Sequence, residues 1–136
     1  MALESDIRVP GLFAGEDKDL EFEIFAEDQD PASAFAVMQN VVGFTFVWEL
    51  WKASRRIDPH RRLVGDPVIS KSSASGITVP GEFHALRKEN SQRVRVRLTS
   101  DDLANLDATL NYVYRLRRSD PGSRTVLSYG VLSVLA

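Results

Sequence analysis

The sequence predicts an all-β fold, an antiparallel β-sandwich or small barrel with at most one helical turn. About seven or eight short segments alternate between apolar and polar residues, which is the period of a half-buried strand. Turn-forming residues separate these segments, as in Ser119–Ser123. No internal repeat, heptad pattern or flexible linker interrupts the order, and the length predicts a single domain over residues 1–136.

The first half of the chain contains the strongest strand signal. Leu20–Phe25 alternates, with its glutamates opposite its apolar residues. Ala32–Asn40 is ambiguous between a helical turn and irregular packing. Val41–Trp51 follows, and its β-branched and aromatic residues favour a strand over a helix. Alternation places the following side chains on one face: Val42, Phe44, Phe46, Trp48 and Leu50. Because each such burial contributes about 1.5–3 kcal/mol, we expect this strand to anchor the core.

The second half of the chain contains further strand signals and one helical signal. Strands are expected at Pro67–Lys71, Gly76–Val79, Arg93–Leu98, Asn111–Arg117 and, as one strand or a pair, Thr125–Val134. Long polar segments separate some of them, at Lys52–Asp66 and Pro80–Gln92. The run Thr99–Leu103 offers a capping residue and early carboxylates, which predicts a short helical turn near Asp101–Leu106.

Composition excludes several classes of function. The net charge of −2 argues against a protein built to neutralise phosphates, so no nucleic-acid partner is predicted. The absence of cysteine excludes disulfides, thiolate metal sites and cysteine nucleophiles. Met1–Asp6 is acidic and lacks the features of a signal peptide, and the apolar stretch Val41–Trp51 is too short to span a bilayer. We therefore expect a soluble protein made in the cytoplasm, without a membrane partner.

The chain carries no recognisable catalytic signature, so we predict that it is not an enzyme. His60 and His84 lie in different polar segments without ligand spacing, and no metal site is predicted. There is no Gly-x-Ser-x-Gly elbow and no phosphate-binding glycine loop. We expect no catalytic residue, cofactor or small-molecule substrate. A small hydrolase built on Glu49 or on the Asp101–Asp102 pair is kept as an alternative. That alternative requires one of these carboxyl groups to lie in an apolar pocket, which raises its pKa.

Arginines alternate along two predicted strands. Arg93, Arg95 and Arg97 share one face, and Arg115 and Arg117 share a face of another segment. If the two strands pair, these residues form a basic stripe. The favoured interpretation is a solvated face paired with acidic residues, and an acidic protein partner or nucleic acid are the alternatives. Nucleic acid is disfavoured because the tyrosines alternate onto the opposite face instead of interleaving with the arginines.

A basic segment after the strongest strand marks the candidate protein interface. Trp51 ends that strand, and an exposed indole can anchor a protein interface or stack on a sugar ring, although burial against the neighbouring loop is the simpler interpretation. The predicted interface consists of Trp51, Arg55, Arg56, Arg61 and Arg62. The apolar end of the chain, Val131–Ala136, also needs cover from its own sheet or from a neighbouring subunit.

Several segments together carry a resemblance to a known family, over about residues 10–136. They are Asn40–Phe46, Asp66–Lys71, Gly76–Ile77, Val94–Asp102, Tyr112–Leu116 and Val126–Leu132. Their order resembles small virion proteins of tailed bacteriophages, in particular the N-terminal domain of phage baseplate upper proteins. The resemblance implies an immunoglobulin-like antiparallel β-sandwich with one short helical turn. It also implies a non-enzymatic structural protein, an attachment or decoration module on the tail, baseplate or head.

The same resemblance implies partners and a location. The partners would be other virion proteins, in a homo-oligomer or multi-copy assembly, and the protein would reside in the virion after synthesis in the host cytoplasm. The alternative is a carbohydrate-binding β-sandwich for host recognition. That alternative requires Trp51 and at least one tyrosine to form an exposed flat platform.

Overall fold

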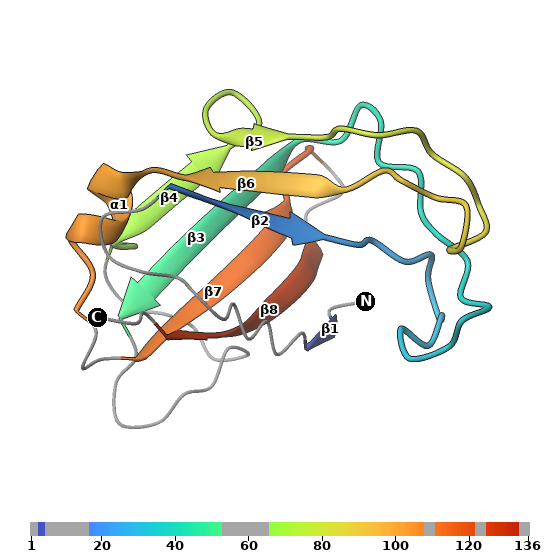
Figure 1. Cartoon of the computed structure of the whole chain (residues 1–136), viewed down its shortest axis with the longest axis horizontal. Coiled ribbons are helices and arrows are strands. Elements are labelled where there is room, and N and C mark those ends of the chain that lie inside the picture. The colour runs from blue at the N-terminus through green and yellow to red at the C-terminus, as the bar shows by residue number, and fades with distance from the viewer. Residues whose placement is uncertain (1–2, 5–16, 53–65, 108–110, 122–124, 134–136) are drawn as a thin grey trace.

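The computed structural model describes residues 3–4, 17–52, 66–107, 111–121 and 125–133. These residues form β1 (Leu3–Glu4), β2 (Lys18–Phe22), β3 (Phe46–Lys52), β4 (Ile69–Ser72), β5 (Ile77–Thr78), β6 (Val94–Leu98), α1 (Ser100–Ala104), β7 (Asn111–Arg118) and β8 (Thr125–Ser133). Two sheets face each other as layers, and their strands cross at an angle (Figure 1). The predicted all-β sandwich with one short helix is confirmed.

The strand order is that of an immunoglobulin-like sandwich. One sheet has the order β2-β6-β5 and the other has the order β1-β8-β7-β3-β4. The first matches strands B, E and D of the immunoglobulin fold, and β8, β7 and β3 match G, F and C, with β4 beside β3 in the place of C′. All pairs within the sheets are antiparallel except that of β1 with β8, which is parallel.

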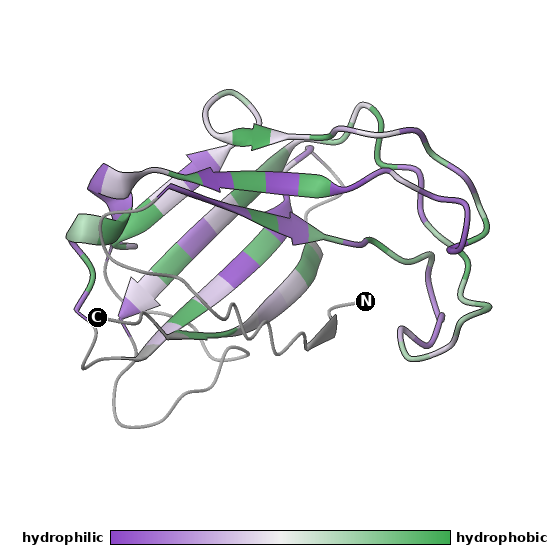
Figure 2. Ribbon diagram, viewed as in Figure 1, coloured by the Kyte–Doolittle hydropathy of each residue, from purple (hydrophilic) through white to green (hydrophobic). Residues whose placement is uncertain are grey.

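The core lies between the two sheets and follows the alternation of the sequence. Figure 2 shows apolar and polar residues alternating along β3 and β7. The inward side chains are buried: Leu20 and Phe22 from β2, Phe46, Trp48 and Leu50 from β3, Val94, Val96 and Leu98 from β6, and Tyr112, Tyr114 and Leu116 from β7. The register places Leu20 beside Val96 and Trp48 beside Leu116, so large side chains of paired strands share the inner face.

The strongest predicted strand begins later than expected. Gly43 has a φ of +83° in the turn before β3, and this left-handed conformation ends the extended alternation. Val42 is therefore 71% exposed, and the prediction that it faces the core is wrong. Phe44 is partly buried, and the guanidinium carbon of Arg118 lies 3.5 Å from the centroid of its ring.

The predicted helical turn, α1, connects β6 to β7. The Thr99 side chain accepts a hydrogen bond from the Asp102 backbone N–H, and the Asp102 carboxylate accepts one from the Thr99 N–H, which completes a capping box. After the helix, the Asp107 N–H donates to the Tyr112 hydroxyl over 2.7 Å. Such a tyrosine corner near the start of strand F is typical of immunoglobulin-like sandwiches. Within the part of the chain that the structure describes, no helix has the length and apolarity that crossing a bilayer requires.

An aromatic cluster joins the two sheets at the centre of the core. The rings of Phe22 and Tyr114 have centroids 5.8 Å apart, and Tyr114 stacks on Trp48 with centroids 6.2 Å apart. In antibody domains a disulfide joins the equivalents of β2 and β7 and packs on a tryptophan of strand C. Because this chain has no cysteine, aromatic rings fill that position. Each such ring pair contributes about 0.5–1.5 kcal/mol beyond its burial.

Two long connections extend the sandwich at the end opposite to α1 (Figure 1). Residues 23–45 join β2 to β3, and residues 79–93 join β5 to β6. Isolated β-bridges link Phe25 with Met38 and Val37 with Leu86, and the Met38 N–H donates to the Ala85 carbonyl over 2.9 Å. These paired connections are referred to below as the loop platform.

Candidate protein-interaction surface

A buried polar network holds the two connections of the loop platform together. Gln92 is 4% exposed; its Oε1 accepts a hydrogen bond from the Val41 N–H at 3.1 Å, and its Nε2 donates to Asn40 Oδ1 at 3.2 Å. Asn90 is also buried, and its Oδ1 accepts from the His84 N–H at 2.9 Å while its Nδ2 donates to the Gln92 carbonyl. Because buried amides with satisfied polar atoms specify one arrangement, this network fixes the platform.

Gly81 allows the β5–β6 connection to close on itself. Its φ is +91°, and a Cβ at this position would lie 2.1 Å from the Ser91 carbonyl oxygen. The two ends of this connection are also joined by a hydrogen bond, in which the Glu82 N–H donates to Ser91 Oγ over 2.9 Å. A residue with a side chain therefore cannot replace Gly81 without moving the backbone.

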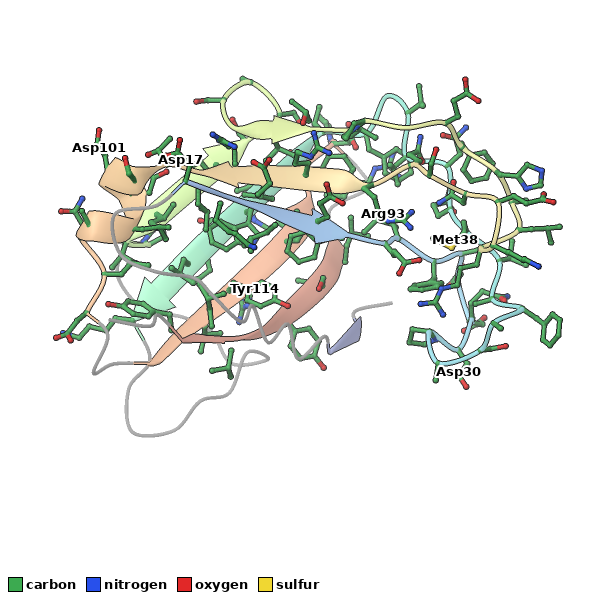
Figure 3. The ribbon with its side chains drawn as sticks, viewed as in Figure 1. Asp17, Asp30, Met38, Arg93, Asp101 and Tyr114 are labelled. Carbon is green, nitrogen blue, oxygen red and sulfur yellow. The ribbon has the colours of Figure 1, made fainter. Side chains whose placement is uncertain are left out.

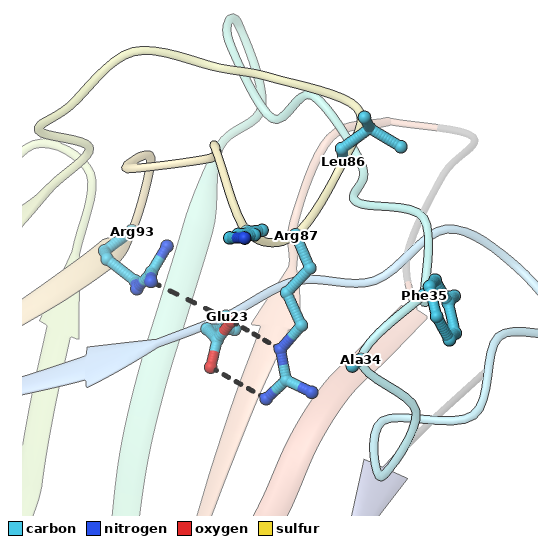
Figure 4. Close-up of a pocket in the computed structure, with 7 residues that line it drawn as sticks. Glu23, Ala34, Phe35, Leu86, Arg87 and Arg93 are labelled. Carbon is cyan, nitrogen blue, oxygen red and sulfur yellow. Dashed lines mark hydrogen bonds and ion pairs between the residues drawn. The ribbon is translucent and has the colours of Figure 1, made fainter.

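The loop platform carries a pocket of about 630 Å³ (Figure 4). Its lining consists of Glu23, Ala34, Phe35, Leu86, Arg87, Lys88 and Arg93. Phe35 is 90% exposed and Leu86 is 54% exposed, so two large apolar side chains border the pocket in contact with solvent. A cavity of this size can accept side chains of a partner or a small ligand.

One carboxylate holds two guanidinium groups inside the pocket. Glu23 Oε2 lies 3.2 Å from Arg87 Nε and 3.8 Å from Arg93 Nη2. Arg87 also donates to the Pro31 carbonyl over 2.8 Å, which ties the β5–β6 connection to the β2–β3 connection. With Lys88, three cationic side chains and one anionic side chain line the pocket, and its lining is cationic.

An acidic turn (residues 27–30) directly precedes Pro31, whose carbonyl accepts a hydrogen bond from the pocket residue Arg87. Glu27, Asp28 and Asp30 are exposed in this turn, and Asp28 has a φ of +62°. Asp30 Oδ1 accepts a hydrogen bond from the Ala32 N–H, which shapes the exit of the turn. Figure 3 shows Asp30 at the outer edge of the loop platform, far from Asp101 of α1. Because Pro31 follows the turn and bonds to Arg87, acidic and basic groups share one surface.

Of the predicted interface residues, the described part of the chain includes Trp51, which is not part of this surface. Arg55, Arg56, Arg61 and Arg62 lie outside the described residues. Trp51 lies at the end of β3 distant from the loop platform, on the face opposite to Trp48, and it is half-buried. The Arg115 guanidinium carbon lies 5.8 Å from the centroid of the Trp51 ring, and the indole nitrogen is buried without a hydrogen-bond partner among the described residues.

The predicted arginine stripe does not form, because β6 and β7 belong to different sheets. β6 pairs with the acidic strand β2, where Arg95 lies 2.8 Å from Glu21 and Arg97 lies 3.0 Å from Asp17 and 3.2 Å from Asp19. The hydrogen bond and charge of Asp19 raise the pKa of Arg97 above its ordinary value. The interpretation of a solvated face paired with acidic residues is therefore confirmed for β6.

Two carboxylates of the hydrolase alternative, those of Glu49 and Asp102, take part in structural ion pairs. Glu49 lies 3.0 Å from Arg117 on the neighbouring strand β7. Asp102 caps α1 and lies 2.7 Å from Lys71 of β4. Burial alone would raise the pKa of Asp102, but hydrogen bonds from Lys71 and Thr99 outweigh it and lower that pKa. Neither carboxylate lines the pocket of the loop platform.

The tyrosines and the histidines are the remaining predicted site residues. All three tyrosines of the chain are buried, so no tyrosine joins Trp51 in the exposed platform that carbohydrate binding requires. His60 lies outside the described residues, and His84 Nε2 lies 2.9 Å from the Glu89 carboxylate. The described ranges contain no group of three or more side chains that could hold a metal ion.

Sequence patterns do not single out Phe35 and Leu86. Phe35 lies in the ambiguous segment Ala32–Asn40, and Leu86 lies in the polar segment Pro80–Gln92, neither of which has a strand or helix period. The available signal was a large apolar residue surrounded by small and polar residues next to an acidic turn. That signal separates an exposed residue from a core residue only when the path of the loop is known.

No protein-family model matches this chain, and neither a curated protein nor a solved structure is found to be similar to it. A functional assignment therefore depends on the geometry of the described residues and on the resemblance noted in the sequence.

Proposed function

We propose that the protein is a non-enzymatic structural module of a tailed-phage virion, which attaches through its loop platform to neighbouring virion subunits, either other virion proteins or further copies of itself. The exposure of Phe35 on a fixed loop supports the binding role most directly. Exposed aromatic residues beside a pocket are typical of binding hot spots, because a partner that covers them removes a large apolar area from water. The virion context is supported by the sequence resemblance.

The rigidity of the loop platform favours binding. Gln92 and Asn90 fix the paths of both connections, and Arg87 joins them at the pocket. Little backbone entropy is then lost when a partner binds, which leaves more of the contact free energy for affinity. In the immunoglobulin fold the β2–β3 connection corresponds to the B–C loop, one of the loops with which antibody variable domains bind antigen.

Photo-crosslinking in phage-infected cells tests this proposal. A p-benzoylphenylalanine in place of Phe35 should form an adduct with a structural virion protein, identified by mass spectrometry. The same amino acid at position 68 is the matched control, since Val68 is 49% exposed but lies near the far end of β3, where its N–H donates to the Leu50 carbonyl. Position 68 should give no adduct with that protein.

The two parts of the proposal fail differently. Equal adducts at positions 35 and 68, or none at either, would contradict the binding role of the loop platform. A position-specific adduct with a protein that is absent from the virion would contradict the virion context and leave the binding surface in place.

A further inference from the structure

We infer that the partner of the loop platform is a second copy of this chain, related by a two-fold axis. Phe35 of each copy enters the pocket of the other copy, and the acidic turn of each copy faces the cationic pocket lining of the other. This inference depends on the proposed function, because it names the partner of the same surface.

The shape of the platform is self-complementary. In a two-fold interface the same patch lies on both sides, so a projecting group and the cavity that receives it must belong to one surface. Phe35 provides the projection, since 90% of it is exposed. The pocket beside it is much larger than a phenyl ring and presents Ala34 and Leu86 as apolar contacts. Figure 4 shows Phe35 and Leu86 on the two connections that border the pocket.

The charges of the platform are also self-complementary. Lys88 lines the pocket and forms no ion pair among the described residues, while the one carboxylate there, that of Glu23, is already shared by Arg87 and Arg93. Glu27 in the acidic turn is exposed and likewise forms no ion pair within the described ranges. Opposite charges that are unpaired within one copy can pair across a two-fold axis, and they then set the orientation of the partner.

The predicted dimer is weak and sensitive to salt. The platform is one end of a small domain, so the buried area should fall below the roughly 1,600 Å² of a standard interface, in the range of weak and transient complexes. Charge pairs at its rim are screened at high ionic strength, so association should weaken when salt is raised.

Sedimentation equilibrium of the full chain at low and high salt tests the inference. The wild type should form dimers, and Phe35→Ser should weaken dimerisation at least about tenfold, as expected for an interface hot spot. Val68→Ser is the matched control, because it removes an exposed apolar side chain away from the platform and should leave the dissociation constant unchanged. A dimer that is insensitive to Phe35→Ser would overturn the inference.

A charge exchange tests the same interface without changing its apolar part. Lys88→Glu alone and Glu27→Lys alone should each weaken the dimer, because each places like charges opposite one another twice. An equimolar mixture of the two variants should form a heterodimer about as tightly as the wild type, since one charge pair keeps its original sign and the other is restored with reversed sign. Lys52→Glu, at the far end of β3, should have no effect. Failure of the mixture to associate would overturn the inference.

The outcomes separate this inference from the proposed function. A wild-type chain that stays monomeric up to about 1 mM, where even binding of about −4 kcal/mol would be visible, excludes a second copy as the partner. If position 35 then still gives a specific adduct with a different virion protein, the proposed function stands. A self-adduct of doubled mass from position 35 would instead support the second copy.

Discussion

The buried Gln92 amide should be a sensitive point of the loop platform, and Gln92→Leu is the perturbation that isolates its polar role. Leucine is apolar and of comparable size, so the substitution limits any cavity while removing both hydrogen bonds. The Val41 N–H loses its acceptor, and Asn40 Oδ1 loses a donor. Val41 is buried, so its N–H cannot reach water unless the β2–β3 connection opens.

The magnitude follows from these two losses. An unsatisfied buried N–H costs about 1–3 kcal/mol, whereas the lost bond to the exposed Asn40 side chain costs about 0.5 kcal/mol because water can replace it. The better burial of leucine offsets about 1 kcal/mol of this. We expect the free energy of unfolding to fall by about 0.5–2.5 kcal/mol and the melting temperature to fall by about 2–10 °C for a domain of this size.

Urea unfolding followed by tryptophan fluorescence measures this change, because Trp48 is fully buried in the folded state. Gln39→Leu is the matched control: Gln39 is half-buried, and its side chain donates to the Asn40 carbonyl at the surface. Its effect should stay within about 0.5 kcal/mol. If Gln92→Leu lowers the stability no more than Gln39→Leu, the network does not fix the platform in the way argued above.

Two further predictions concern the substitution of two glycines, Gly81 and Gly43, and the ion pair between Asp102 and Lys71. Gly81→Ala should lower the free energy of unfolding by at least about 2 kcal/mol, because its new Cβ meets the Ser91 carbonyl. The control Gly43→Ala should lower it by about 1 kcal/mol, because only the φ of Gly43 is unfavourable for alanine. Equal losses of stability in urea unfolding would contradict the clash at Gly81. The pKa of Asp102 lies below its ordinary 3.8 in the folded state, so its carboxylate stabilises the fold above that pH and loses this contribution as the pH falls below it. The stability of the wild type should therefore exceed that of Asp102→Asn at about pH 6, and the difference should shrink as the pH falls through the lowered pKa of Asp102. A difference that stays constant with pH would show that the Lys71 contact contributes no ionised-state stability.

Period-2 alternation predicted the regular part of the fold because each residue of a strand has a fixed side. It placed Phe46, Trp48 and Leu50 on the core face and Arg95 and Arg97 on the outer face. The partners of those arginines could not be predicted, because strand pairing is a long-range property. β6 pairs with β2 across more than seventy residues of chain, as the 74-residue separation of Arg95 from Glu21 shows.

The loop platform could not be predicted because no period governs it. Its conformation is set by contacts between distant segments, such as the bond from Val41 to Gln92, which are 51 residues apart. A single left-handed residue, Gly43, was enough to move Val42 from the predicted core to solvent. Phe35 is exposed for the same reason: its position depends on where the β2–β3 connection is held, and not on its neighbours in sequence.

The ring cluster of Phe22, Trp48 and Tyr114 has a consequence for how this protein acquires its structure. A domain that depends on a disulfide between its sheets must wait for thiol oxidation, which takes seconds to hours, and its stability then follows the redox potential of its surroundings. Here noncovalent packing joins the sheets, with the aromatic cluster at its centre, and the chain has no thiol to oxidise. Folding can therefore be completed without an oxidant, and the folded protein should tolerate reducing and oxidising conditions equally.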